Sequence, residues 1–447
     1  MRQRVVRVAL LAGLIVLALL LLASMCGGGN GGGSKSDGDN SPAPVRHSAA
    51  PLTRLTVPSA YDTRRGWELP DASPEYAIAR DSGRIAYLER VAESRFRLRT
   101  LDAATGKPGW AGQPWHPPAS PSPDSAPDTF PRLLSVAKDG REYFVTWSFG
   151  TVDEDALTTA GTFVTLDVYD AADGARRRVE LPWPAAPTVS GTGPGIVVSD
   201  GRARSAVVDP VSGEVTQIPE ASLGYPRGCA GCRRLTEVRG VTEKGLLVSG
   251  DTGFWVRGGW YSGRSAPSRT DRASGVPTSV APGYVLAKWQ PVKGSKEAAA
   301  YDIWAVHEAA GGKALAKAQC HKPAIEPGVY PQAVLSPGGG YLVAGNLAFD
   351  LERRKAYCFE QSDGSKPLTL TTVTDSGVAY GATSARSPAD ALAGGGAPIE
   401  LDLAAAVPEA LSPNVRLPAA EVAGVGLFSW TDSKDRLHLI GYPRRKQ

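Results

Sequence analysis

One phrase recurs along the chain: a short apolar strand, a turn rich in glycine and aspartate, and a second apolar strand. Clear copies such as "YAIARDSGRIAYLER" and "LLSVAKDGREYFVTW" begin at Tyr76, Leu133, Leu235, Ala333 and Leu370. Weaker copies are "APTVSGTGPGIVVSD", "VPTSVAPGYVLAKW" and "VAGVGLFSWTDSKDRLHLIG". Glycine supplies the positive φ angle of a tight turn, and aspartate or serine caps the bend. Each copy therefore predicts a β-hairpin.

A second phrase follows most of these copies, in which a strand ends in aspartate just before a glycine turn. It carries Asp102 and Gly106 in "LRTLDAATGKPGW", Asp170, Gly174 and the later Trp183 in "LDVYDAADGARRRVELPW", Asp209 and Gly213 in "AVVDPVSGEVTQIP", and Asp350 in "LAFDLERRKAYCF". In "IWAVHEAAGGKALAK" we expect His307 to take the place of the aspartate. Turn capping explains the four aspartates better than catalysis does.

Two hairpins make a four-stranded antiparallel sheet, and the units recur at roughly 37 to 57 residues, close to the spacing of propeller blades. Blades stacked radially bury both sheet faces and leave only short edges. The chain is therefore predicted to be all-β, a seven- or eight-bladed β-propeller of four-stranded antiparallel blades over residues 55–443, behind an N-terminal membrane anchor. We expect "VPSAYDTRRGWELP" (57–70) to be a lone strand that completes the last blade. Two separate β-sandwiches are the alternative.

The stretch "LDAATGKPGW" resembles the repeat of PQQ-like bacterial propellers, whose blades carry a D-x-x-T-G turn and a docking tryptophan. Asp102, Thr105, Gly106 and Trp110 match that repeat. Elsewhere the Asp–Gly turn persists, but the tryptophan is mostly missing. With its lipoprotein-like start, the chain is similar to membrane-anchored propeller proteins of high-GC Gram-positive bacteria. The resemblance implies the fold, and fold alone does not imply function.

The N-terminal residues predict export. Arg2, Arg4 and Arg7 precede an uncharged apolar run from Val8 to Cys26, the layout of a secretory signal or of a helix just long enough to span a bilayer. The positive charges keep the N-terminus cytoplasmic, so the rest of the chain is expected outside. Residues 1–26 are thus a signal peptide or membrane anchor, and the Gly/Ser-rich residues 27–54 are a disordered tether.

The segment "LASMC" resembles a bacterial lipobox, in which small residues precede a cysteine that becomes diacylated. Cys26 is accordingly a lipidation candidate, although Met25 stands where glycine or alanine is usual. An uncleaved single-span anchor and free secretion are the alternatives. With either a lipid anchor or an uncleaved span, the protein is expected at the cell membrane, on its extracytoplasmic face.

Four cysteines remain when Cys26 is set aside, which suggests two disulfides in an oxidising exterior. "GCAGC" makes Cys229 and Cys232 the natural local pair, leaving Cys320 with Cys358. Redox activity of the C-x-x-C motif, supported by nearby arginines, and metal binding stay open beside a structural disulfide.

Composition and motifs leave a binding role as the favoured function. The formal charge of +4 is small for 447 residues, so nucleic acid is not an expected partner. An envelope protein or a small ligand is expected instead, with no cofactor. Trp260, Tyr261 and Arg264 in a polar insert are the residue types of interface hot spots, although a loop without a binding role is the alternative. A quinone- or metal-dependent oxidoreductase of the PQQ-propeller type is the alternative function.

The anchor prediction can be tested by replacing Cys26. If Cys26 is acylated, Cys26→Ser should block processing or release the protein from the membrane after signal cleavage. Fractionation with N-terminal sequencing measures this. A membrane-bound species that still carries residues 1–25 in both variants would establish an uncleaved span instead.

Overall fold

The computed structural model describes residues 53–92, 94–119, 131–152, 160–201, 204–361 and 364–445. All of them belong to one compact unit, 45–447, and only this unit is described below. The predicted anchor and Cys26 lie outside the described residues. None of the described helices is long and apolar enough to cross a membrane.

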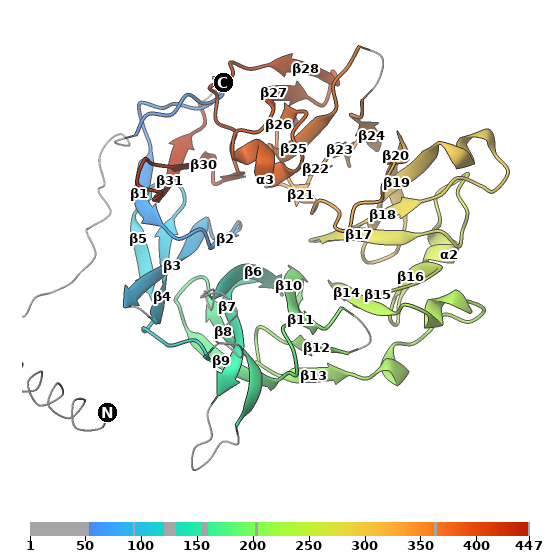
Figure 1. Ribbon diagram of the computed structural model, residues 1–447, viewed down its shortest axis with the longest axis horizontal. Helices are drawn as coiled ribbons and strands as arrows, with labels where there is room; N and C mark the ends of the chain where they lie inside the picture. Colours follow the sequence, from blue (N-terminus) through green and yellow to red (C-terminus); the bar gives the residue numbers. More distant parts are fainter. Residues whose placement is uncertain are drawn as a thin grey trace, which may run out of the picture. The chain divides into compact units, whose positions relative to one another are not determined.

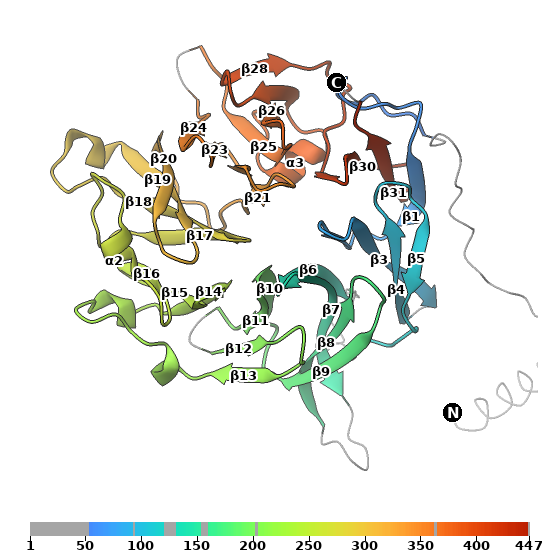
Figure 2. The same ribbon diagram turned by 180° about the vertical axis from the view of Figure 1, so that it is seen from behind.

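Eight antiparallel sheets stand around a common centre, as Figures 1 and 2 show from the two sides. In blades 1 to 7, the first strand in chain order lies nearest the centre and later strands follow outward (Figure 1). The protein is therefore an eight-bladed β-propeller. This confirms the predicted fold and settles the blade number.

The strands follow the chain order blade by blade. Blades 1 to 4 consist of β2 (Tyr76–Ala79), β3 (Arg84–Ala92), β4 (Arg95–Asp102) and β5 (Pro108–Ala111); β6 (Arg132–Lys138), β7 (Arg141–Val152), β8 (Gly161–Asp170) and β9 (Arg176–Pro182); β10 (Thr188–Gly193), β11 (Gly195–Ser199), β12 (Ser205–Val208) and β13 (Val215–Ile218); and β14 (Glu237–Thr242), β15 (Gly245–Gly250) and β16 (Gly253–Val256). The outer edge of blade 4 is completed by a bridge between Trp255 and Tyr261.

Blades 5 to 8 continue this order and end with a sheet built from both ends of the domain. They consist of β17 (Val276–Ala281), β18 (Tyr284–Trp289), β19 (Tyr301–Glu308) and β20 (Ala314–His321); β21 (Val334–Leu335), β22 (Tyr341–Ala344), β23 (Leu347–Asp350) and β24 (Lys355–Cys358); β25 (Leu368–Val373), β26 (Val378–Thr383), β27 (Ala397–Asp402) and β28 (Val407–Ala410); and β29 (Ala420–Val422), β30 (Val425–Thr431), β31 (Leu437–Pro443) and β1 (Trp67–Ala72). Short helices α2 (Ser262–Ser265), α3 (Pro388–Leu392), η1 (Glu220–Ser222), η2 (Gly231–Arg233) and η3 (Lys296–Ala299) lie in connections.

Seven of the eight hairpins predicted from the first repeated phrase are the inner strand pairs of blades 1 to 7. The eighth copy, residues 422–441, corresponds to the middle pair of blade 8, β30 with β31. Burial follows position within a blade. All five residues of β11 are buried, whereas the four residues of the rim strand β28 are exposed. Neighbouring blades therefore form the core between them, and each blade depends on the next to cover its apolar face.

The predicted lone strand closes the ring. β1 pairs antiparallel with β31, with Trp67 opposite Gly441 and Leu69 opposite Leu439. Figure 1 shows the blue β1 beside the red β31, so the two ends of the domain share blade 8. The strand begins at Trp67, later than the predicted start at residue 57. Before it, Tyr61 forms an isolated β-bridge with Arg444.

A tryptophan from one blade docks on the turn of the next. The Trp67 indole Nε1 donates to the carbonyl oxygen of Ala103 at 2.9 Å. A Cβ atom on Gly106 would lie 2.4 Å from Trp67, and Gly106 has a φ of +68°. Glycine is required here both by the turn and by the close approach of the ring.

The same junction recurs with other residues around the propeller. Trp110 donates to Ala171 and packs on Gly174, and Trp260 donates to Ala309 and packs on Gly312. Between blades 2 and 3 an arginine takes this place: Arg177 donates to the Ser212 carbonyl and packs on Gly213. The docking tryptophan is thus more frequent than the sequence repeat suggested: Trp67 and Trp260 make the same contact as Trp110, although neither follows a D-x-x-T-G turn.

Glu308, not His307, occupies the aspartate position in blade 5. In blade 1 the Asp102 amide donates to Lys107 and the Gly106 amide donates to Asp102; in blade 5 Glu308 makes the same two bonds with Lys313 and Gly312. The expectation for His307 was therefore wrong by one residue. A glutamate at the end of the strand conceals the repeat in the sequence.

His307 fills a buried position next to this turn. Its Nδ1 bonds to the Gly312 carbonyl at 2.9 Å, and its Nε2 accepts a hydrogen bond from Trp289 at 3.3 Å. The ring also stacks on Trp260, with ring centroids 5.8 Å apart. Burial lowers the pKa of His307 to about 4.

This pKa predicts a loss of stability in mild acid. An unfolded histidine titrates near ~6.5, so between that pH and 4 the unfolded chain binds a proton that the folded chain does not. The contribution of neutral His307 to the free energy of unfolding should be fully present above pH ~6.5 and should fall by about 3 kcal/mol as the pH drops to 4. Urea midpoints across this range should show a flatter pH dependence for His307→Phe than for the wild type. His116→Asn, at an exposed histidine, should keep the wild-type slope; equal slopes in all three proteins would contradict the prediction.

Candidate functional site

The repeated aspartates serve the blade turns. The Asp102 carboxylate accepts from the amide and hydroxyl of Thr105 at 2.8 and 2.6 Å. Asp170, Asp209 and Asp350 each accept from one or two backbone amides of their own turns. Because each carboxylate sits in a different blade and caps its own turn, these four side chains do not form one cation site.

The four described cysteines lie in two pairs. Cys229 and Cys232 have Cα atoms 5.4 Å apart, and Cys320 and Cys358 have Cα atoms 5.8 Å apart, with each pair of sulfurs at disulfide-bonding distance. The second pair joins the outer strands β20 and β24 of two neighbouring blades. Such strands are close enough here for a disulfide, as the chain pattern predicted.

The surroundings of the C-x-x-C motif fit a structural disulfide. Cys232 is fully buried in the core between blades 3 and 4. Arg233 stacks over Tyr225, and Arg234 pairs with Asp251 at 3.0 Å. In the described part of the chain, a possible three-ligand metal grouping is Cys320, Cys358 and Glu360. Its two sulfurs are those of the second pair, so a disulfide would leave Glu360 without thiolate partners.

The predicted interface residues have different positions. Trp260 is half-buried in the junction with blade 5, and Tyr261 forms the outer edge of blade 4. Arg264 is the exposed member of the three, in α2. The aromatic character of this segment is therefore explained by packing between blades.

A cavity of about 970 Å³ opens along the central axis, against the inner strands of blades 1 to 5. Its walls are mostly apolar, with Tyr76, Ile78, Leu134, Val136 and Val241 among them. Charged residues of the hairpin turns surround this wall: Arg80, Asp81, Lys138, Asp139, Glu142, Glu243 and Lys244. A cavity with apolar walls and a few convergent polar groups suits a ligand or a peptide segment.

Arg80 connects blade 1 to the non-adjacent blade 6 at this cavity. Its guanidinium donates to the carbonyl oxygen of Leu335 in blade 6 at 3.1 Å. Burial lowers the pKa of Arg80, while the negative charges of Asp375, Glu142 and Asp81 act in the opposite direction. Arg80 directly precedes the first hairpin turn, where the sequence pattern indicated only a turn.

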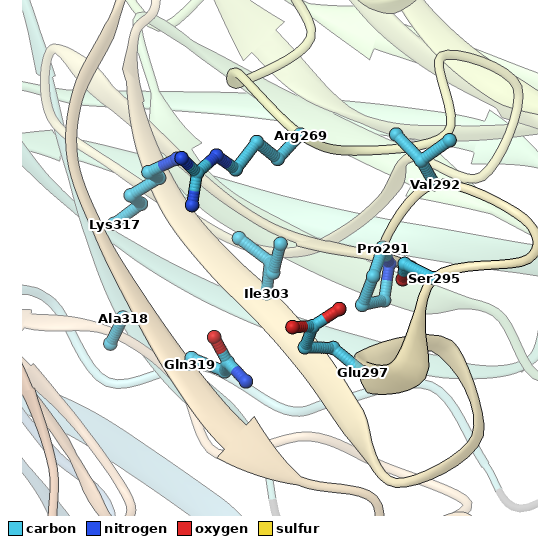
Figure 3. A pocket seen from close by; sticks show the side chains of 9 residues that line it. All are labelled: Arg269, Pro291, Val292, Ser295, Glu297, Ile303, Lys317, Ala318 and Gln319. Atoms are coloured by element: carbon cyan, nitrogen blue, oxygen red, sulfur yellow. The ribbon is translucent and has the colours of Figure 1, made fainter.

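A second cavity, of about 580 Å³, lies at blade 5 (Figure 3). It is bounded by Arg269 from the connection before β17, by Pro291 to Glu297 from the connection between β18 and β19, and by residues of β19 and β20. Its lining includes two cationic side chains, Arg269 and Lys317, and the carboxylate of Glu297. Three segments separated in sequence supply these groups, so no local motif predicted that they would come together.

No protein-family model matches the chain, and a search of curated proteins finds no match.

Proposed function

We propose that the protein is a non-enzymatic binding or scaffold module, tethered to the membrane by its N-terminus and exposed on the extracytoplasmic face of the cell envelope. The observation that carries this proposal is the pairing of the four described cysteines, including the pair between blades 5 and 6. Disulfides form and persist in oxidising compartments, which supports an exported domain. The basic and apolar start of the chain supports the same topology.

Two cavities in the ring support binding as the role of the exported domain. The central cavity places charged turns around an apolar wall, and the blade 5 cavity gathers polar side chains from three segments. The aspartates that resemble those of PQQ-like propellers are engaged in turns. An envelope protein or a small ligand is the expected partner, and the mixed charges around the central cavity do not suit nucleic acid.

The proposal predicts no free thiols at these four cysteines in the native host. Alkylation in intact cells followed by non-reducing peptide mapping should find Cys229 linked to Cys232 and Cys320 linked to Cys358. Replacing both Cys320 and Cys358 by alanine should lower stability by ~3–4 kcal/mol in the chain-entropy model.

Two results would contradict the proposal. Free thiols at all four positions, with the protein in the cytoplasmic fraction, would place the domain in a reducing compartment. A bound cofactor that absorbs visible light in the protein purified from its host would indicate the oxidoreductase alternative.

A further inference from the structure

The blade 5 cavity has an apolar floor between two polar walls. Ile303 on β19, Ala318 on β20 and Pro291 form the buried part of its lining. Figure 3 shows Arg269 and Lys317 together on one side of Ile303, and Glu297 on the other. From one side of the cavity to the other, a ligand would therefore meet positive charge, an apolar surface and negative charge.

Arg269 and Lys317 form a cation pair without a carboxylate partner among the described residues. The Lys317 ammonium donates to the carbonyl and hydroxyl oxygens of Ser268, both at 2.8 Å, which fixes its position. Burial and the charge of Arg269 lower the pKa of Lys317. Two neighbouring lysines differ: Lys288 pairs with Glu326 and Lys293 with Asp271. Two like charges held together favour an anion between them.

The opposite wall carries hydrogen-bonding groups that the protein leaves unused. The side chains of Glu297 and Gln319 make no hydrogen bond to another described residue, and the Ser295 hydroxyl oxygen is buried without a partner. Glu297 and Gln319 are exposed to solvent and so remain available to a ligand, whereas the buried Ser295 hydroxyl is a group that normally has a hydrogen-bond partner. A ligand with donor groups would satisfy the carboxylate and the amide oxygen, and the negative charge of Glu297 disfavours a second anion at this end.

We propose that this cavity binds a small organic acid whose carboxylate lies against Arg269 and Lys317, and whose amine or hydroxyl donors meet Glu297 and Gln319. This inference rests on the proposed binding function and names its ligand class. Amino acids or peptide ends carry the donor as an amine, and sugar acids carry it as hydroxyls. A phosphate ion supplies the anion without these donors.

Calorimetric titration of the full-length protein with three probes tests the proposal: glycylglycine, glucuronate and inorganic phosphate. At least one of the two organic acids should bind about tenfold more tightly than phosphate, because only these ligands reach both walls. Arg269→Gln should weaken that binding at least about tenfold. Glu297→Gln should narrow the preference for the organic acid over phosphate. Arg272→Gln, at an exposed arginine of the same connection, is the matched control and should leave binding unchanged.

The possible outcomes distinguish the two kinds of ligand donor, and they distinguish failure of this inference from failure of the proposed function. Stronger binding of glycylglycine assigns the amine donor, and stronger binding of glucuronate assigns the hydroxyl donors. The inference is overturned if neither organic acid binds at about 10 mM, if phosphate binds equally well, or if Arg272→Gln weakens binding as much as Arg269→Gln. Circular dichroism of each variant shows that the fold is intact. Loss of this binding would leave the disulfide result unchanged, and free thiols in cells would not alter these affinities.

Discussion

The pairing of β1 with β31 is the contact on which the rest of the propeller depends. Without β1, blade 8 would expose an unpaired sheet edge, and Trp67 would not cover the turn of blade 1. A polar contact reinforces the same seam, because the Glu68 carboxylate accepts from Thr53 and lies 2.7 Å from a ring nitrogen of buried His438. Each blade covers its apolar faces with its neighbours, so an open ring would expose core on both sides of the gap.

Much of this architecture could be read from local patterns. The hairpins depend on nearby glycine and aspartate, and a two-residue period places their apolar side chains inside, so the inner strand pairs of blades 1 to 7 were predictable. The contacts between blades were not. Trp260 docks on the turn of Gly312, about fifty residues further along the chain, and no repeat spacing connects them. Glu308 replaces aspartate at one turn and shifted the predicted position to His307, because the backbone bonds, not the side chain, define that turn.

The candidate sites show the same division between local and long-range information. The turn aspartates and the paired cysteines follow from short motifs and from the expected compartment. Arg269, Lys317 and Glu297 come together only because blade 5 folds its two connections over β19 and β20. The aromatic and basic residues of the insert around Trp260 predicted an interface. In the folded chain Trp260 packs at the junction between blades 4 and 5, and Arg269, nine positions later, lines the blade 5 cavity.

Ring closure through β1 places the inner hairpin turns of five blades around one central cavity. Hydrogen exchange of the intact protein, followed by mass spectrometry, measures this closure most directly. The amides of β1 that pair with β31 should exchange as slowly as those of β30 and β31, because all three strands belong to one sheet and open together. Exchange of the β1 amides within seconds, with β30 and β31 still protected, would show that the ring does not close through this strand.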